Sequence, residues 1–131
     1  MTSASKTRPK NLGEVEQLVM DYVWSHGPAT AEACREALAR RPMKDSTVRT
    51  ILRRLEEKGY VTHQVSGRTY VYQAVERRRN VAVRAVRHIV DRFCGGSIEE
   101  LLVGMVESDV LDERDLERLA RKIARAKEKK P

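Results

Sequence analysis

The sequence has few of the residues from which a disulfide framework or a metal site is built. Its two cysteines, Cys34 and Cys94, lie far apart and form no Cys-x-x-Cys pair. Its three histidines, His26, His63 and His88, show no metal-ligand spacing with each other or with a cysteine. We therefore predict reduced thiols, no metal and no cofactor.

Long apolar runs are also missing. No stretch is apolar for long enough to cross a bilayer, and the first ten residues, MTSASKTRPK, lack the apolar run of a signal peptide. The sequence contains no Gly-rich phosphate loop, no paired carboxylates in an apolar setting and no Ser/His/Asp grouping. We therefore expect a cytoplasmic protein with no membrane partner, and not an enzyme.

Basic residues are abundant instead. The 131 residues include 26 lysines and arginines against 19 acidic residues, which gives a formal net charge of +7. Such an excess favours an anionic partner, and nucleic acid is the leading candidate.

The segment TVRTILRRLEEKG, residues 47–59, has the clearest helical pattern of the chain. Its apolar side chains recur at i, i+3, i+4 and i+7, the spacing of one helical face that packs on a core: Val48, Ile51, Leu52 and Leu55. We expect Asp45 or Ser46 to cap the start of this helix and Gly59 to end it.

The other side of this helix carries hydroxyls and arginines. Thr47, Thr50 and Arg54 share one stripe, and Arg49 and Arg53 lie beside it, whereas acidic residues follow only at positions 56 and 57. A helix that is merely solvated usually mixes its charges along its length. This face is therefore a candidate binding surface.

Two helices are predicted before this segment, after a basic mobile arm at residues 1–10. The first covers residues 13–25, and its inward side chains are Leu12, Val15, Leu18, Val19, Tyr22 and Val23. The second begins after Thr30, where Ala31, Cys34 and Leu38 share a face. On this pattern Cys34 is a small core residue rather than a reactive thiol.

After Gly59 the apolar period changes from helical to two. Val61, His63 and Val65 alternate with polar residues, and Tyr70, Tyr72 and Ala74 do the same after the SGR sequence at 66–68. This pattern predicts a β-hairpin with Ser66 and Gly67 in the turn and Arg68 at the tip. We expect both tyrosines to pack on the helices rather than to stack on bases.

Three helices followed by a two-stranded wing make a winged helix-turn-helix, which we assign to residues 11–75. Residues 76–131 return to a helical pattern with three helices, interrupted at Gly95 and Gly96. Ser97 with Glu100 forms a capping-box signature, and the last helix follows Asp112 before dissolving into RAKEKKP. The fold class is therefore mainly α with a small β-hairpin.

The C-terminal region has more apolar surface than three short helices can bury. The simplest way to bury this apolar surface is against a second copy of the chain. The alternative is that the three helices fold back on the winged domain of their own chain. The predicted dimerisation residues are Val86, Ile89, Val90, Phe93, Leu101, Leu102, Met105, Leu116, Leu119 and Ile123.

Four segments carry a resemblance to a known family: LGEVEQLVMDYVW at 12–24, GPATAEACREAL at 27–38, STVRTILRRLEEKGYV at 46–61 and GRTYVYQA at 67–74. The sequence resembles the penicillinase-repressor family of winged-helix transcriptional regulators, and GGSIEELLVGMVE continues the resemblance more weakly. The resemblance implies a homodimer that binds an inverted-repeat operator in double-stranded DNA and represses transcription.

A helix in the major groove presents hydroxyls and arginines to phosphates or base edges. We therefore predict these DNA-binding residues: Ser46, Thr47, Arg49, Thr50, Arg53, Arg54 and Arg68. The residues leave open which arginine reads a base. The alternative function is a winged-helix module for protein interaction or for sequence-neutral DNA binding.

The sequence departs from both known ways of relieving repression in similar proteins. Beta-lactam-responsive members are cut by a sensor-linked protease at an Asn-Phe bond, and the aligned bond here is Gly104–Met105. Copper-responsive members carry paired Cys-x-Cys motifs near the C-terminus, whereas residues 95–131 contain no cysteine. The pattern argues against proteolytic induction and excludes metal induction by that route.

Overall fold

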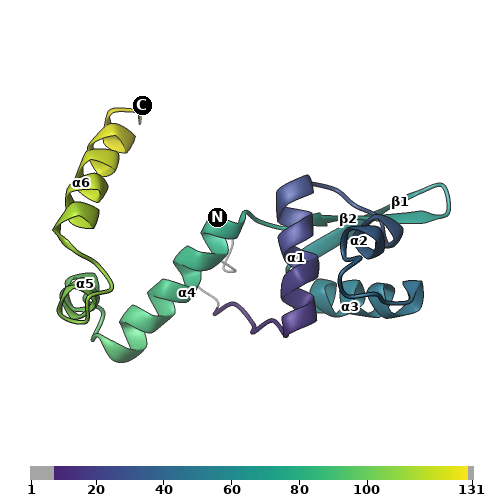
Figure 1. Ribbon diagram of the computed structural model, residues 1–131, viewed down its shortest axis with the longest axis horizontal. Helices are drawn as coiled ribbons and strands as arrows, with labels where there is room; N and C mark the ends of the chain where they lie inside the picture. The colour runs from purple at the N-terminus through teal and green to yellow at the C-terminus, as the bar shows by residue number, and fades with distance from the viewer. Residues whose placement is uncertain (1–7, 130–131) are drawn as a thin grey trace. The chain divides into compact units, whose positions relative to one another are not determined.

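The computed structural model describes residues 8–129, so most of the predicted arm at 1–10 lies outside the described residues. In this part of the chain the elements are α1 (Glu14–His26), α2 (Ala31–Ala37), α3 (Asp45–Glu57), β1 (Val61–Ser66), β2 (Thr69–Ala74), α4 (Arg78–Phe93), α5 (Ile98–Glu107) and α6 (Glu113–Glu128) (Figure 1). The chain divides into two compact units, Met1–Ala85 and Val86–Pro131. The predicted mainly α fold with one small hairpin is confirmed.

The first unit has a core built from α1, α2, α3 and the hairpin. Its fully buried side chains are Val19, Met20, Val23, Cys34, Val48, Leu52, Leu55 and Val61. The prediction that Cys34 is a core residue is confirmed. On α1 the prediction was partly wrong, because Leu18 is only half-buried and Met20 takes its place. The buried stripe of α1 starts at Glu16, which the apolar pattern omits.

Glu16 is a buried acid, with 8% of its surface exposed. Its Oε1 accepts hydrogen bonds from Lys58 Nζ at 2.7 Å and from the Gly13 backbone N–H at 2.7 Å. The Lys58 hydrogen bond, followed by the Gly13 one, holds the pKa of the Glu16 carboxyl below its ordinary value. Lys58 also donates to the Asn11 carbonyl at 2.9 Å, so it joins the end of α3 to the start of α1.

The start of α3 differs from the prediction. The helix begins at Asp45, and its N-cap residue is Lys44, whose side chain makes no capping bond. Neither Asp45 nor Ser46 caps the helix, because both lie inside its first turn and Asp45 pairs with Arg35 of α2. The predicted end is confirmed, since Gly59 adopts a φ of 86° just after the helix.

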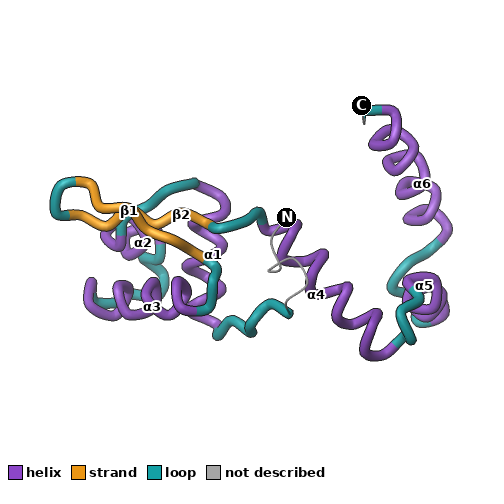
Figure 2. Tube along the Cα trace, turned by 180° about the vertical axis from the view of Figure 1, so that it is seen from behind, coloured by secondary structure: helices purple, strands orange, loops and turns teal. Residues whose placement is uncertain are grey.

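The hairpin has the predicted antiparallel pairing, with Val61 opposite Ala74 and Ser66 opposite Thr69. Ser66 is therefore the last residue of β1 and not part of the turn, which consists of Gly67 and Arg68. Gly67 has a φ of 66°, the left-handed conformation that a tight hairpin turn requires at this position. The tip projects beyond the helices in two opposite views (Figure 1 and Figure 2).

Tyr72 attaches the hairpin to the helices. Its ring is buried, with 6% exposed, and its backbone exchanges two hydrogen bonds of 2.8 Å with Ala29 in the loop between α1 and α2. Burial raises the pKa of the Tyr72 hydroxyl above its ordinary value. The same prediction was wrong for Tyr70, which is 49% exposed because it lies nearer the projecting tip.

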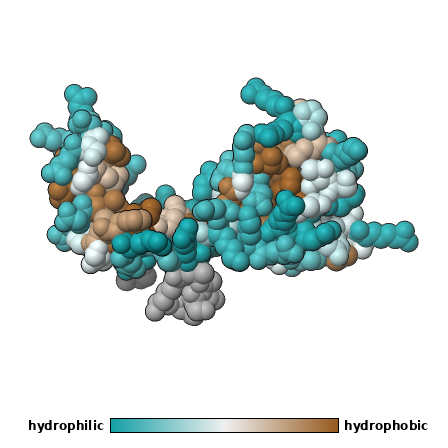
Figure 3. Space-filling view, turned by 90° about the horizontal axis from the view of Figure 1, so that it is seen from below, coloured by the Kyte–Doolittle hydropathy of each residue, from teal (hydrophilic) through white to brown (hydrophobic). Residues whose placement is uncertain are grey.

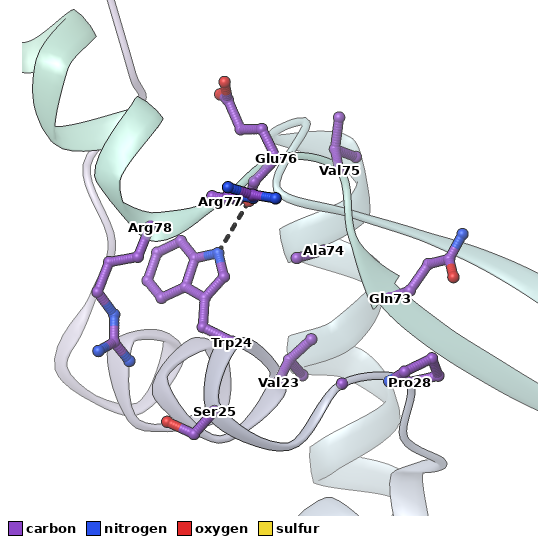
Figure 4. A pocket seen from close by; sticks show the side chains of 11 residues that line it. Val23, Trp24, Ser25, Pro28, Gln73, Ala74, Val75, Glu76, Arg77 and Arg78 are labelled. Carbon is purple, nitrogen blue, oxygen red and sulfur yellow. Dashed lines mark hydrogen bonds between the residues drawn. The ribbon is translucent and has the colours of Figure 1, made fainter. Parts of the chain in front are cut away.

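Trp24, on α1, holds the segment that follows β2 (Figure 4). Its indole Nε1 donates to the Glu76 carbonyl at 3.1 Å, and the Arg78 guanidinium carbon lies 5.3 Å from the ring centroid. The Glu76 carboxylate in turn pairs with Arg84. Contacts within the first unit therefore extend past residue 75, where we placed the boundary between the two predicted domains.

In the second unit, side chains cap both helix starts, although only half of the predicted Ser97–Glu100 capping box forms, since the Ser97 N–H donates to the Cys94 carbonyl instead. Ser97 Oγ accepts the Glu100 N–H at 3.2 Å, and Asp112 exchanges hydrogen bonds of 2.8 and 3.1 Å with Asp115. The prediction that the last helix ends before RAKEKKP, residues 125–131, was wrong, because α6 continues to Glu128. Good helix formers and the basic residues of its last turn favour this longer helix.

The thiol of Cys34 is fully buried, and burial raises its pKa to about 11. At pH 8 roughly a thousandth of such a thiol is ionised, and the thiolate is the reactive form. We expect a disulfide reagent such as DTNB to label the half-buried Cys94 in the native protein, and to label Cys34 only after urea is added. A Cys94→Ser variant assigns the two reactions. Equal labelling rates in the native protein would contradict the buried position of Cys34.

Replacing Lys58 by Met removes the main partner of the Glu16 carboxylate. We expect a loss of about 1–3 kcal/mol in the free energy of unfolding at pH 7, measured with urea. Because the folded-state pKa of Glu16 is lowered, its contribution is present above the ordinary pKa of 4.5 and is lost as pH falls through the lowered pKa. The stability difference between the parent and the variant should therefore shrink in acid.

Lys44→Met is the matched control, since Lys44 is an exposed lysine whose side chain forms no capping bond. It should change the free energy of unfolding by less than about 0.5 kcal/mol. Equal effects of the two lysine substitutions would show that the Glu16–Lys58 pair does not stabilise the fold.

Candidate nucleic-acid interface

The helix α3 separates its apolar and polar residues onto different faces. All four predicted core residues, Val48, Ile51, Leu52 and Leu55, are buried. The predicted binding residues of this helix lie away from the core: Thr50 is half-buried, and the exposed ones are Ser46, Thr47, Arg49, Arg53 and Arg54. Packing against α1 and α2 therefore leaves the polar face of α3 open.

Arg49 and Arg53 of α3 and Arg68 of the hairpin turn line one cleft, which has a volume of about 820 Å³. Its other walls are formed by residues of the α2 start and of both strands, among them Thr30, His63, Tyr70 and Tyr72. The chain segment that follows α3 turns back as a hairpin, and this brings Arg68 to the same cleft as the arginines of the helix. Three of the seven predicted residues thus share one site.

The remaining four predicted residues, Ser46, Thr47, Thr50 and Arg54, do not line the cleft. Thr50 Oγ1 donates to the Ser46 carbonyl at 3.0 Å, which engages its hydroxyl within the helix. The structure therefore sorts the polar surface of α3 into one side that faces the cleft and another that faces away from it.

The cleft is also lined by three acidic residues, Glu32, Asp45 and Glu56, and the last two have partners other than its arginines. Asp45 pairs with Arg35, and Glu56 is held by His63. Among residues 8–129, none of Arg49, Arg53 and Arg68 forms an ion pair with a carboxylate. Three unpaired guanidinium groups on a concave surface attract a polyanion.

His63 is a site residue that the sequence did not reveal. Its Nδ1 lies 2.7 and 2.9 Å from the two oxygens of Glu56, and its ring stacks on Tyr70 with centroids 4.2 Å apart and an interplanar angle of 7°. In the sequence it is one member of an alternating strand pattern. His63 reaches Glu56, seven residues earlier, only because β1 lies against the end of α3 in the folded chain.

The described part of the chain has neither a metal-binding cluster nor a membrane-spanning helix. No three His, Cys, Asp or Glu side chains are grouped there in a way that would hold a metal ion. Among the described helices, none combines the length and the apolar character needed to span a bilayer. The cleft between α3 and the hairpin brings three arginines together with three acidic residues, and two of those acids have partners other than these arginines.

A family model described as penicillinase repressor matches residues 12–125, which is most of the chain. The chain belongs to the penicillinase repressor family. This confirms the resemblance carried by the segments at 12–24, 27–38, 46–61 and 67–74, and the match includes α5 and most of α6 as well.

Two curated relatives illustrate the range of similarity within this family. A protein of Mycobacterium tuberculosis named "Transcriptional regulator BlaI" is 38% identical over 112 residues, which cover 83% of this chain and 81% of the relative. The "Penicillinase repressor" of Bacillus licheniformis is 26% identical over 110 residues, which cover 82% of this chain and 85% of the relative. Both similarities run through the winged region and into the C-terminal helices.

Among solved structures, the hsRosR-S4 complex aligns with a TM-score of 0.51 at 14% identity, over 80% of this chain and 94% of that one. At this identity the likeness concerns the fold alone. The fold of this family member is a winged helix-turn-helix followed by a helical region, as the order of its helices and strands predicted.

Proposed function

We propose that this protein is a transcriptional repressor that binds double-stranded DNA through α3 and the hairpin. The observation that carries this proposal is the cleft lined on two sides by Arg49, Arg53 and Arg68, none of which forms an ion pair within residues 8–129. Family membership supports it, because the similar proteins are named as transcriptional regulators and repressors. The net charge of +7 acts in the same direction.

In this proposal α3 enters the major groove and one sugar-phosphate strand runs through the cleft between α3 and the hairpin. Arg68 then holds the strand from the hairpin side, and Arg49 and Arg53 hold it from the helix. The side of α3 that faces away from the cleft, with Thr47 and Arg54, meets the base edges. This arrangement gives the cleft arginines a positioning role and assigns the sequence reading to the rest of the helix.

We further propose that the repressor is a homodimer acting on an inverted-repeat operator in the cytoplasm. The second unit supports this, because brown apolar surface gathers over it in Figure 3. Phe93 is 75% exposed, and the other exposed members of the predicted set are Val86, Ile89, Leu116, Leu119 and Ile123. Leu101, Leu102 and Met105 are half-buried, whereas Val90 is buried, with 5% exposed.

A sensor-linked protease is not part of this proposal. The bond aligned with the cleavage site of beta-lactam-responsive members is Gly104–Met105, which lies within α5 and has neither of the residues of the Asn-Phe bond. We propose that repression by this protein is relieved in another way.

The first test replaces each cleft arginine by alanine. Each of Arg49→Ala, Arg53→Ala and Arg68→Ala should cost about 1–3 kcal/mol of binding, on a duplex selected from a random pool by the intact chain. Phosphate contacts carry no sequence information, so the losses should be similar on a scrambled duplex, whereas Arg54→Ala should reduce the difference between the two duplexes. Fluorescence anisotropy at fixed salt measures all of these affinities.

Arg121→Ala, on the exposed surface of α6, is the control for a lost positive charge and should leave the affinity nearly unchanged. If the parent binds the selected and scrambled duplexes equally, it is a sequence-neutral binder rather than an operator-specific repressor. If it binds neither, the winged helix serves another kind of partner.

The second test introduces a charge into the apolar surface of the second unit. Leu119→Asp places a carboxylate on an exposed side of α6, so the helix should remain folded while the contact between two copies is lost. DNA affinity should fall by roughly 10²–10⁴, because the second half-site contact is no longer intramolecular. Leu102→Asp on α5 should act in the same direction.

Sedimentation of the parent and of the variants reads the oligomeric state directly. Arg121→Asp is the matched control, because Arg121 lies two positions from Leu119 and therefore on the opposite side of the helix. It should sediment as the parent does. A parent that sediments as a monomer, or a Leu119→Asp variant that remains dimeric, would refute the proposed dimer surface.

A further inference from the structure

The cleft proposed to hold a phosphate strand contains the carboxylate of Glu56 beside Arg49 and Arg53. Glu56 lies on the same side of α3 as these two arginines, since the three occupy positions i, i+4 and i+7. A free carboxylate at this place would repel a phosphate strand and would also compete for the arginines. The structure shows neither arginine paired with Glu56.

The partner of this carboxylate is His63, which approaches it from β1. Its Nδ1 lies 2.7 Å from one carboxylate oxygen and 2.9 Å from the other. Because carboxylate oxygens only accept hydrogen bonds, Nδ1 carries the hydrogen and donates it. Both oxygens of Glu56 are therefore turned toward the hairpin, away from an ion pair with Arg49 or Arg53.

The other side of the contact is a stack of aromatic rings. The His63 ring lies parallel to that of Tyr70 on β2, with centroids 4.2 Å apart, and 5.7 Å from the ring of Tyr72. Tyr72 is the residue whose ring enters the core. His63 thus links the end of α3 to both strands of the hairpin.

We propose that His63 is a positioning residue for DNA binding. It withdraws the Glu56 carboxylate from the arginines of the cleft, and through its stack on Tyr70 it sets the direction of the hairpin that carries Arg68. His63 acts through Glu56 and Tyr70 rather than by touching DNA. The inference rests on the proposed function, because it assigns a role within the same cleft.

The experiment is a double-mutant comparison in the full-length chain. His63→Ala frees the Glu56 carboxylate and should weaken binding to the selected duplex roughly ten-fold, the effect of about one charged contact. Adding Glu56→Gln removes the freed charge, so the double variant should recover the part of that loss that the carboxylate causes. Glu56→Gln alone should bind at least as tightly as the parent. This recovery is a result that a purely structural role of His63 does not produce.

Two further variants separate the hydrogen bond from the stack. His63→Asn keeps a donor near the position of Nδ1 but loses the stacked ring, so it should bind more tightly than His63→Ala and no better than Tyr70→Ala. Tyr70→Ala removes the stacked ring and should weaken binding on the selected and scrambled duplexes alike. Gln64→Ala, on the next residue and the opposite face of β1, is the control and should bind as the parent does.

The outcomes distinguish this inference from the proposed function. If the parent binds DNA and His63→Ala binds equally well, the inference is overturned while the proposed function stands. The same holds if a folded His63→Ala variant is weakened but Glu56→Gln brings no recovery. If the parent does not bind duplex DNA at all, the proposed function fails, and the role of His63 fails with it.

Discussion

The site depends on the attachment of Tyr72 to the three-helix core. A hairpin of two short strands is only marginally stable by itself, and its direction relative to the helices is set by what it contacts. Tyr72 supplies both kinds of contact, a buried ring and two backbone hydrogen bonds to Ala29. These bonds make the loop after α1 a third, very short partner of the sheet. With β2 held there, the turn residue Arg68 lies on the cleft that the arginines of α3 also line.

The charge of the cleft follows from how its acids are used. A helix as rich in charge as α3 would ordinarily pair its arginines with its own carboxylates at i+3 and i+4. Here the acid at the start of the helix pairs with α2, and the acid near its end pairs with β1. Tertiary partners thereby take two of the three acids of α3, and Arg49 and Arg53 form no ion pair with a described residue. The availability of these arginines is thus a property of the fold as much as of the composition.

The sequence predicted the elements well where the signal was local. The spacing of Val48, Ile51 and Leu55 gave the buried face of α3, and the alternation through β1 and β2 gave the pairing of the hairpin. Errors arose where the partner is distant along the chain. Glu16 meets Lys58 across 42 positions, and Trp24 meets Glu76 across 52. Periodicity indicates which side of a helix is buried, but it does not identify the residues that lie opposite.

The same limit explains why Arg68 was predicted as a site residue and His63 was not. A charge at a hairpin tip is exposed whatever the hairpin packs on, whereas the role of His63 arises only from the side chains that surround it. Tyr70 was predicted to be in the core because it lies two positions from Tyr72 and therefore on the same face of the strand. The helices bury only the part of the hairpin that is far from its turn. The alternation of apolar and polar residues along a strand shows which face is buried, but not at which residue the burial ends.

The contact between Trp24 and Glu76 also has a spectroscopic consequence. Trp24 is the single tryptophan of the chain, so its fluorescence comes from one known place, the join between α1 and the segment leading into α4. Indole emission responds to the hydrogen bonding of its N–H and to nearby charge, and here these are the Glu76 carbonyl and the Arg78 guanidinium. The fluorescence of Trp24 can therefore report on the contact between α1 and the segment leading into α4, in solution and without an attached label.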